Sequence, residues 1–232
     1  MLLAAALFWP EKPAMNDHSQ RIAGVYGIVD TGVLAWEKML SATVAALDGG
    51  VGVIQYRNKS IDRQRRFQQA RALSLVCRSR GVSFIVNDDV ALAKAVVADG
   101  VHIGCQDGTI ATARARLGPS AIIGVSCYNS LDKATDAAAA GADYVAFGSF
   151  FPSTVKPDAP RAKLELLTLA RTRLSVPIVA IGGVTAANGA ALLEAGAEAL
   201  AVISSLFATA RVYQAAVELT QLFNNIQIRN QS

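Results

Sequence analysis

The feature of this sequence that most constrains its fold is a pattern that repeats from Gly24 onward: a short β-branched run, a polar or glycine-rich break, and an alanine-rich stretch with helical periodicity. The repetition predicts eight strands that alternate with eight helical intervals. The predicted strands are Val25 to Val29, Gly52 to Tyr56, Ser83 to Val86, Gly100 to Ile103, Ile122 to Val125, Tyr144 to Phe147, Ile178 to Ile181 and Leu200 to Ile203. The helices with the clearest periodicity are Arg63 to Arg80, Ala134 to Ala140 and Leu164 to Arg173.

Strands that alternate with helices pair in parallel through right-handed crossovers. Eight such units most simply close on themselves, so we predict an α/β fold, a single-domain (β/α)8 TIM barrel. The 232-residue chain has the length of such a barrel, and no linker rich in proline, serine or charge divides it. An open doubly wound sheet is the alternative, because the number of strands does not prove closure.

The barrel is expected to span residues 21–225, between a loose N-terminal extension of residues 1–20 and a C-terminal tail of residues 226–232. The extension opens with an apolar run that is too short to span a bilayer. The alternative to a loose extension is that translation starts at Met15, so that the apolar run precedes the functional protein. Within the barrel, several helices are expected to stop at a left-handed glycine directly before the next strand, in residues 48–51, 98–101, 140–143 and 194–197.

Charge and cysteine content narrow the class of protein. The net charge of +4 suits an anionic ligand, but the basic residues are dispersed along the chain, which argues against a nucleic-acid surface. Cys77, Cys105 and Cys127 are odd in number and lack metal-ligand spacing. We therefore expect a cytoplasmic protein without disulfides or zinc. A homo-oligomer is compatible with the alanine-rich outer helices, and no membrane contact is expected.

The second predicted strand ends in Gln55-Tyr-Arg-Asn-Lys59. Because side chains alternate across a strand, Gln55, Arg57 and Lys59 should leave the same side of the chain and converge on one ligand. Arg offers a planar fork of donors and Lys a mobile charge, which together suit a phosphate or diphosphate. The alternative is a strand that simply ends in a polar, solvated loop.

Acidic residues follow the next two strands. The third strand ends in Asn87-Asp88-Asp89, and the segment after the fourth contains Asp107. Two carboxylates from adjacent strand ends suit Mg²⁺, which binds one or two carboxylates and completes its shell with substrate phosphates and water. Asp88 is the better candidate, because Asp89 is better explained as the cap of the helix that starts near Val90. His102 has no partnering cysteine or histidine, and a lone histidine is more often a packed or hydrogen-bonded structural residue than a metal ligand, so it is assigned no role.

Polar and glycine residues also end the last four strands: Ser126 after the fifth, Lys156 between two prolines after the sixth, Gly182-Gly183 after the seventh, and Ser204-Ser205 after the eighth. Paired glycines, hydroxyls and a helix N-terminus in these places are typical of the phosphate site of barrel enzymes. Each feature alone has an ordinary explanation, because tight turns also need glycine and loops also contain lysine.

Taken in order, these segments resemble the thiamine phosphate synthase family. The matching segments are Gln55-Tyr-Arg-Asn-Lys59, Asn87-Asp88-Asp89, Val101-His-Ile-Gly with Asp107, Gly124-Val-Ser126, Phe151-Pro-Ser-Thr-Val-Lys156-Pro, Ala180-Ile-Gly-Gly183 and Val202-Ile-Ser204. The resemblance implies a Mg²⁺-dependent transferase that joins hydroxymethylpyrimidine diphosphate to a thiazole phosphate or its carboxylated form. The products are thiamine phosphate and diphosphate. It further implies that the departing diphosphate leaves a pyrimidine methylene cation, which the thiazole nitrogen captures.

The resemblance also assigns roles. It implies that Asp88 and Asp107 ligate Mg²⁺ and that Arg57, Lys59, Ser126 and Lys156 act in catalysis. The residues it implies for the pyrimidine diphosphate are Gln55, Tyr56, Arg57, Asn58, Lys59, Asn87, Ser126 and Lys156, and those for the thiazole phosphate are Ser153, Thr154, Val155, Gly183, Ile203 and Ser204. Val155 stands where the family usually has a second threonine. Loss of that hydroxyl would weaken thiazole phosphate binding by about 1.5–3 kcal/mol unless Thr154 replaces it.

Two other functions remain as alternatives. A thiazole tautomerase on the same barrel would have no diphosphate to bind and so no need of Arg57, Lys59, Asp88 and Asp107 together. A non-catalytic sensor of phosphorylated ligands would bind without turnover, and the fold alone does not exclude it.

Overall fold

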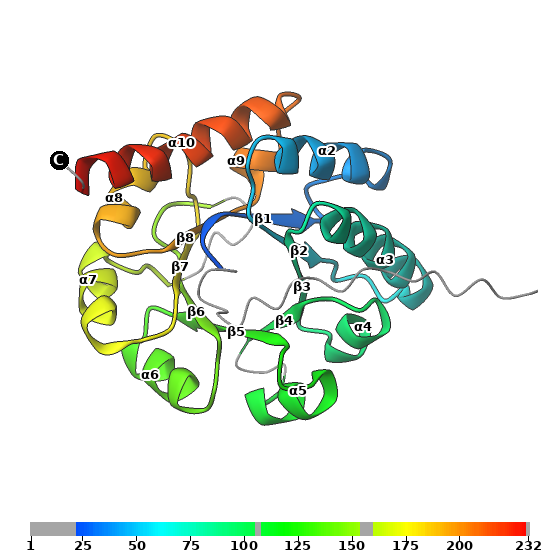
Figure 1. The fold of residues 1–232 in the computed structure, drawn as a ribbon, viewed down its shortest axis with the longest axis horizontal. Helices are drawn as coiled ribbons and strands as arrows, with labels where there is room; N and C mark the ends of the chain where they lie inside the picture. Colours follow the sequence, from blue (N-terminus) through cyan, green and yellow to red (C-terminus); the bar gives the residue numbers. More distant parts are fainter. Residues whose placement is uncertain (1–21, 105–107, 154–159, 231–232) are drawn as a thin grey trace, which may run out of the picture.

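The computed structural model describes residues 22–104, 108–153 and 160–230, and there the chain forms a closed barrel of eight parallel strands (Figure 1). Each strand pairs with the next, and β1 pairs with β8, which confirms the (β/α)8 barrel and excludes the open sheet. The strands are β1 Gly24–Asp30, β2 Val53–Arg57, β3 Ser83–Asn87, β4 Gly100–Ile103, β5 Ile122–Tyr128, β6 Tyr144–Phe147, β7 Ile178–Ile181 and β8 Ala199–Val202.

Helices surround this barrel (Figure 1). They are α2 Trp36–Asp48, α3 Arg63–Ser79, α4 Val90–Ala95, α5 Ile110–Leu117, α6 Leu131–Ala139, α7 Leu164–Arg173, α8 Gly189–Glu194, α9 Ser204–Phe207 and α10 Val212–Asn230. Several start at a side-chain cap: Asp62, Asp89, Thr109 and Ser130 each accept a hydrogen bond from the backbone N–H three residues on. Among the described residues, no helix has the length and apolar character needed to cross a membrane.

The expected glycine stops are correct at three places and wrong at one. Gly50, Gly141 and Gly196 have positive φ after α2, α6 and α8. Before β4, however, Val97 takes the left-handed conformation with φ of 54°, and Gly100 is the first strand residue. A Cβ on Gly100 would lie 1.9 Å from the carbonyl oxygen of Ile122, so this glycine allows close strand packing instead of ending a helix.

The ends of the chain bear on the expected domain boundaries. Residues 1–20, predicted as a loose extension, lie outside the described residues. Helix α10 continues to Asn230, so residues 226–230 of the predicted C-terminal tail are helical. Helix α10 packs against α2, α8 and α9. Figure 1 shows it beside these helices, coloured orange to red.

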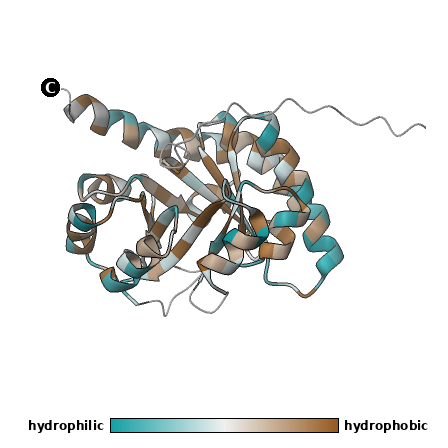
Figure 2. Cartoon of the chain, turned by 60° about the horizontal axis from the view of Figure 1, so that its bottom comes forward, coloured by the Kyte–Doolittle hydropathy of each residue, from teal (hydrophilic) through white to brown (hydrophobic). Residues whose placement is uncertain are grey.

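Buried apolar side chains form two separate clusters because strand residues alternate between the two faces of the barrel wall. The outer cluster fills the space between strands and helices, and Figure 2 shows apolar colour on the strands, while polar colour marks the outer parts of the helices. The inner cluster fills the barrel itself and includes Tyr26, Ile28, Val53 and Tyr144. The inner cluster forms the floor of the site described next.

Candidate active site

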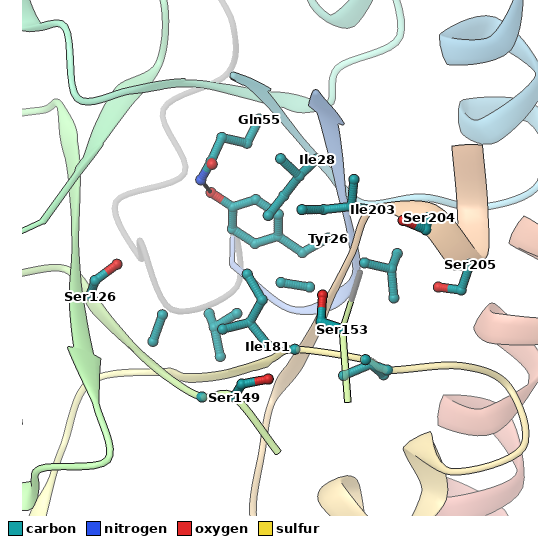
Figure 3. Close-up of a pocket in the computed structure, with 18 of the residues that line it drawn as sticks. Tyr26, Ile28, Gln55, Ser126, Ser149, Ser153, Ile181, Ile203, Ser204 and Ser205 are labelled. Atoms are coloured by element: carbon teal, nitrogen blue, oxygen red, sulfur yellow. Dashed lines mark hydrogen bonds between the residues drawn. The ribbon is translucent and has the colours of Figure 1, made fainter. Parts of the chain in front are cut away.

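A cavity of about 440 Å³ opens at the carboxyl ends of the strands (Figure 3). This is the end of the barrel at which an active site is expected, and the volume suits a small-molecule ligand. Its floor consists of inner-cluster side chains such as Ile28 and Val179. The residues predicted from the sequence that line it are Gln55, Arg57, Asn87, Ser126, Ser153, Gly183, Ile203 and Ser204.

The end of β2 brings two predicted residues into the cavity. Gln55 is buried, and its Nε2 donates to the Tyr26 hydroxyl at 2.8 Å. Two residues on, the Arg57 guanidinium forms an ion pair with Asp30 at the end of β1. Asp30 is almost fully buried and also accepts from the Gly32 backbone N–H at 2.8 Å. The ion pair therefore holds Arg57 in a defined orientation at the cavity wall.

The intervening residues, Tyr56 and Asn58, point away from the cavity. The Tyr56 hydroxyl donates to the Gln69 side-chain oxygen on α3 at 2.7 Å, and Asn58 Nδ2 donates to the Tyr56 hydroxyl and to the same Gln69 oxygen, both at 2.9 Å. Neither residue lines the cavity, and the substrate-binding role inferred for them stays a prediction. Because side chains alternate along the chain here, Tyr56 and Asn58 face the helix layer instead.

Lys59 and Asp88 meet at the rim of the barrel, outside the main cavity. Their charged groups form an ion pair, and the Lys59 side chain is 59% exposed. Asp88 has a φ of 63°, and its backbone N–H donates to the His102 carbonyl at 2.8 Å, so the local backbone directs this residue. A non-glycine residue in this conformation is uncommon, and such residues concentrate at functional sites.

The rim offers a hard oxygen ligand for a metal. Asp88 supplies a carboxylate of the kind that Mg²⁺ binds, which fits one protein ligand of such a site. The second predicted ligand, Asp107, lies outside the described residues, as do Thr154, Val155 and Lys156. The described residues contain no group of three or more His, Cys, Asp and Glu able to hold a metal on their own. Asp89 caps α4 through the Leu92 N–H at 2.8 Å, which confirms its structural role.

The seventh and eighth strand ends form what we call the β7–β8 rim (Gly182, Gly183, Ser204 and Ser205). Both glycines have positive φ, and a Cβ on Gly183 would lie 2.3 Å from the Pro152 carbonyl oxygen. The two serines begin α9, where first-turn N–H groups lack helical partners. The buried Ser205 hydroxyl has no hydrogen-bond partner among the described residues. Figure 3 shows Ser204 and Ser205 across the cavity from Ser126.

Three interior polar residues, Tyr26, Tyr144 and His102, were not predicted as part of the site, although they connect two residues that were. The Tyr26 hydroxyl lies 2.8 Å from that of Tyr144, which lies 2.9 Å from His102 Nδ1, and His102 Nε2 lies 2.8 Å from Ser126 Oγ. Together with Gln55 they form the interior hydrogen-bond chain (Gln55, Tyr26, Tyr144, His102 and Ser126). The interpretation of His102 as a hydrogen-bonded residue is confirmed. Burial raises the pKa of both tyrosines, strongly for Tyr144, so they remain protonated.

Strand β5 is longer than predicted because it contains a bulge. The pairing with β6 shifts register between Ser126 and Tyr128, and Tyr128 has a φ of 55°. Both residues line the cavity. Bulges often redirect side chains beside active sites, and this one depends on pairing with β6, which the β5 sequence alone does not reveal.

Comparisons with known proteins agree on one family. A family model described as thiamine monophosphate synthase matches residues 25–206. The thiamine-phosphate synthase of Azoarcus sp. is 52% identical over 88% of this chain and 98% of its own length, and that of Thiobacillus denitrificans is 54% identical over 81% and 89%. Among solved structures, the thiamine phosphate pyrophosphorylase from Pyrococcus furiosus superposes with a TM-score of 0.81 at 32% identity, covering 90% of this chain and 98% of that one.

Proposed function

Because this chain belongs to the thiamine monophosphate synthase family, we propose that its cavity joins hydroxymethylpyrimidine diphosphate to a thiazole phosphate, forming thiamine phosphate and diphosphate. The observation that carries this proposal is a cavity with two polar sides. Arg57 and Asn87 lie on one side, and the glycines and serines of the β7–β8 rim lie on the other. Two anionic substrates need two such sides.

The β2–β3 side suits the diphosphate. Arg57, held by Asp30, presents its remaining donors to the cavity, and Lys59 stands at the rim with Asp88. These cations stabilise charge where it gathers as the bond to the leaving group breaks. Mg²⁺ bound by Asp88 and Asp107 would neutralise further charge on the diphosphate. From the sequence we propose that Lys156 adds a third cation beside Arg57 and Lys59.

The β7–β8 rim suits the single phosphate of the thiazole. The Ser205 hydroxyl is buried and unpartnered among the described residues, so a phosphate oxygen would satisfy it. Gly183 leaves the backbone open to close approach, and Ser153 and Ser204 add hydroxyls at the same cavity. The sequence predicted a contact between Ser204 and the thiazole phosphate but none for Ser205. Positioning of two substrates then supplies much of the rate without a protein nucleophile.

The test is turnover with defined substrates. Purified protein, hydroxymethylpyrimidine diphosphate, thiazole phosphate and Mg²⁺ should give diphosphate and thiamine phosphate in equal amounts, and chelation of Mg²⁺ should stop the reaction. Asp88→Ala and Lys59→Ala should each lower kcat/KM about a hundredfold or more. Asp48→Ala is the matched control, because Asp48 forms an exposed ion pair with Arg80 on the outer helices.

Two outcomes would contradict the proposal. Isomerisation of the thiazole without condensation would favour the tautomerase, and binding of both ligands without products would favour the sensor. A comparable loss in Asp48→Ala would show that the losses in the rim variants reflect general instability. We also propose the cytoplasm as the site of the reaction, in keeping with the odd number of cysteines.

A further inference from the structure

The interior hydrogen-bond chain crosses the barrel from β2 to β5 and has a definite order. Its members come from β2, β1, β6, β4 and β5 in turn, and consecutive members are 2.8–2.9 Å apart. All five line the cavity. The family resemblance implies substrate contacts for its two ends, Gln55 and Ser126, whereas it assigns no role to the three middle members.

The direction of every hydrogen bond in the chain follows from its first member. The Gln55 amide nitrogen donates to the Tyr26 oxygen. Among the described residues the buried Tyr26 hydroxyl has one other partner, the Tyr144 hydroxyl, so its single proton is satisfied only if it is donated there. Tyr144 then donates its proton to His102 Nδ1, so a neutral imidazole carries its proton on Nε2 and donates it to Ser126 Oγ. The Ser126 proton then has no acceptor within this hydrogen-bond chain, and Ser126 lines the cavity.

The surroundings hold this arrangement in place. Tyr26 and Tyr144 are at most 1% exposed, and their rings lie at centroid distances of 6.0 Å from each other and, for Tyr144, 5.5 Å from His102. Burial keeps both phenols protonated by raising their pKa. Gly124 leaves the space that the Tyr144 ring fills. Tyr26 and Tyr144 are therefore fixed in position and stay protonated, as residues that order a neighbouring hydrogen bond must.

We propose that Tyr26, Tyr144 and His102 are positioning residues that orient the Ser126 hydroxyl as a hydrogen-bond donor to an acceptor atom of the bound pyrimidine diphosphate. An isolated serine hydroxyl rotates and donates or accepts as its neighbours demand. In this chain His102 donates to the Ser126 oxygen, which occupies one of its two lone pairs and leaves its single proton available for donation. The identity of the ligand rests on the proposed function, whereas the order of the hydrogen bonds does not.

The first experiment measures the tautomer of His102. The protein has only two histidines, His18 and His102, so ¹⁵N-histidine labelling gives two imidazole spin systems, and His18→Gln assigns them. We expect neutral His102 with its proton on Nε2 and an accepting Nδ1. Tyr144→Phe removes the donor to Nδ1 and should make the two tautomers mix. A wild-type proton on Nδ1, or a charged ring, would overturn the proposal whether or not the synthase reaction is found.

The second experiment is a double-mutant cycle on kcat/KM. Tyr144→Phe should lower kcat/KM about fivefold, the effect of one misdirected hydrogen bond, and should have no further effect in the Ser126→Ala background. An equal loss in both backgrounds would show that Tyr144 does not act through Ser126. Tyr26→Phe breaks the chain one link further away and serves as the second variant. Ser74→Ala is the control, because it deletes a buried hydroxyl that donates to the Val96 carbonyl on the helix layer.

Discussion

Gly124→Ala should destabilise the protein because the new methyl group would overlap the Tyr144 ring. A Cβ on Gly124 would lie 1.9 Å from Tyr144 Cζ and 2.4 Å from its hydroxyl oxygen, whereas ordinary contact begins at 3.4 Å. The ring would have to move by about 1.5 Å, away from Tyr26 and His102. Overpacking costs about 1–3 kcal/mol, and each of the two hydrogen bonds lost costs about 1 kcal/mol. We expect a total loss of about 3–5 kcal/mol.

Urea unfolding followed by circular dichroism measures this loss, and thermal unfolding should show a Tm lower by about 6–20 °C. The matched comparison uses Tyr144→Leu, which removes the overlapping ring. In that background Gly124→Ala should cost less than about 1 kcal/mol, because the two sites are coupled. Wild-type stability of Gly124→Ala, or the same loss in both backgrounds, would refute the assignment of this glycine to the Tyr144 ring.

Three further predictions concern other parts of the molecule. Asp30→Asn should lower the free energy of unfolding by about 3 kcal/mol in urea titrations and also lower kcat/KM, because Arg57 loses its buried partner; unchanged values would contradict this reading. Asp89→Ala should cost about 1 kcal/mol by removing the cap that accepts from the Leu92 N–H, and Asp89→Asn should restore most of it. Burial raises the pKa of Cys127 to about 12, and Cys77 is buried as well, so in a Cys105→Ser variant at pH 8 both remaining thiols should react with Ellman's reagent only after unfolding.

The fold was largely predictable from local patterns, and the exceptions depend on contacts between distant segments. The strands β4, β6 and β7 have their predicted bounds, because β-branched runs between glycines and helices define them well. Gly100 was misinterpreted because a helix stop and a close strand contact both require glycine. The bulge at Ser126 and the continuation of α10 likewise depend on partners that the local sequence does not show.

The site was predictable where the argument used strand geometry and less so elsewhere. Alternation placed Gln55 and Arg57 together in the cavity. Alternation also predicted that Lys59 points into the cavity. Instead, β2 ends at Arg57, and Lys59 pairs with Asp88 at the rim. Tyr26 and Tyr144 are 118 residues apart and meet only when the barrel closes, so no local pattern marks them as a pair.

The separation of the two apolar clusters restricts how the chain length can vary. Along each strand, successive side chains point alternately into the barrel interior and toward the helix layer. Insertion of one residue into a strand would reverse this direction for every later residue of the strand. Site residues would then point toward the helices, and residues that pack against helices would point into the cavity. Homologous chains that keep this activity should therefore differ in length in the connections between strands and helices, whereas their strands keep a constant number of residues.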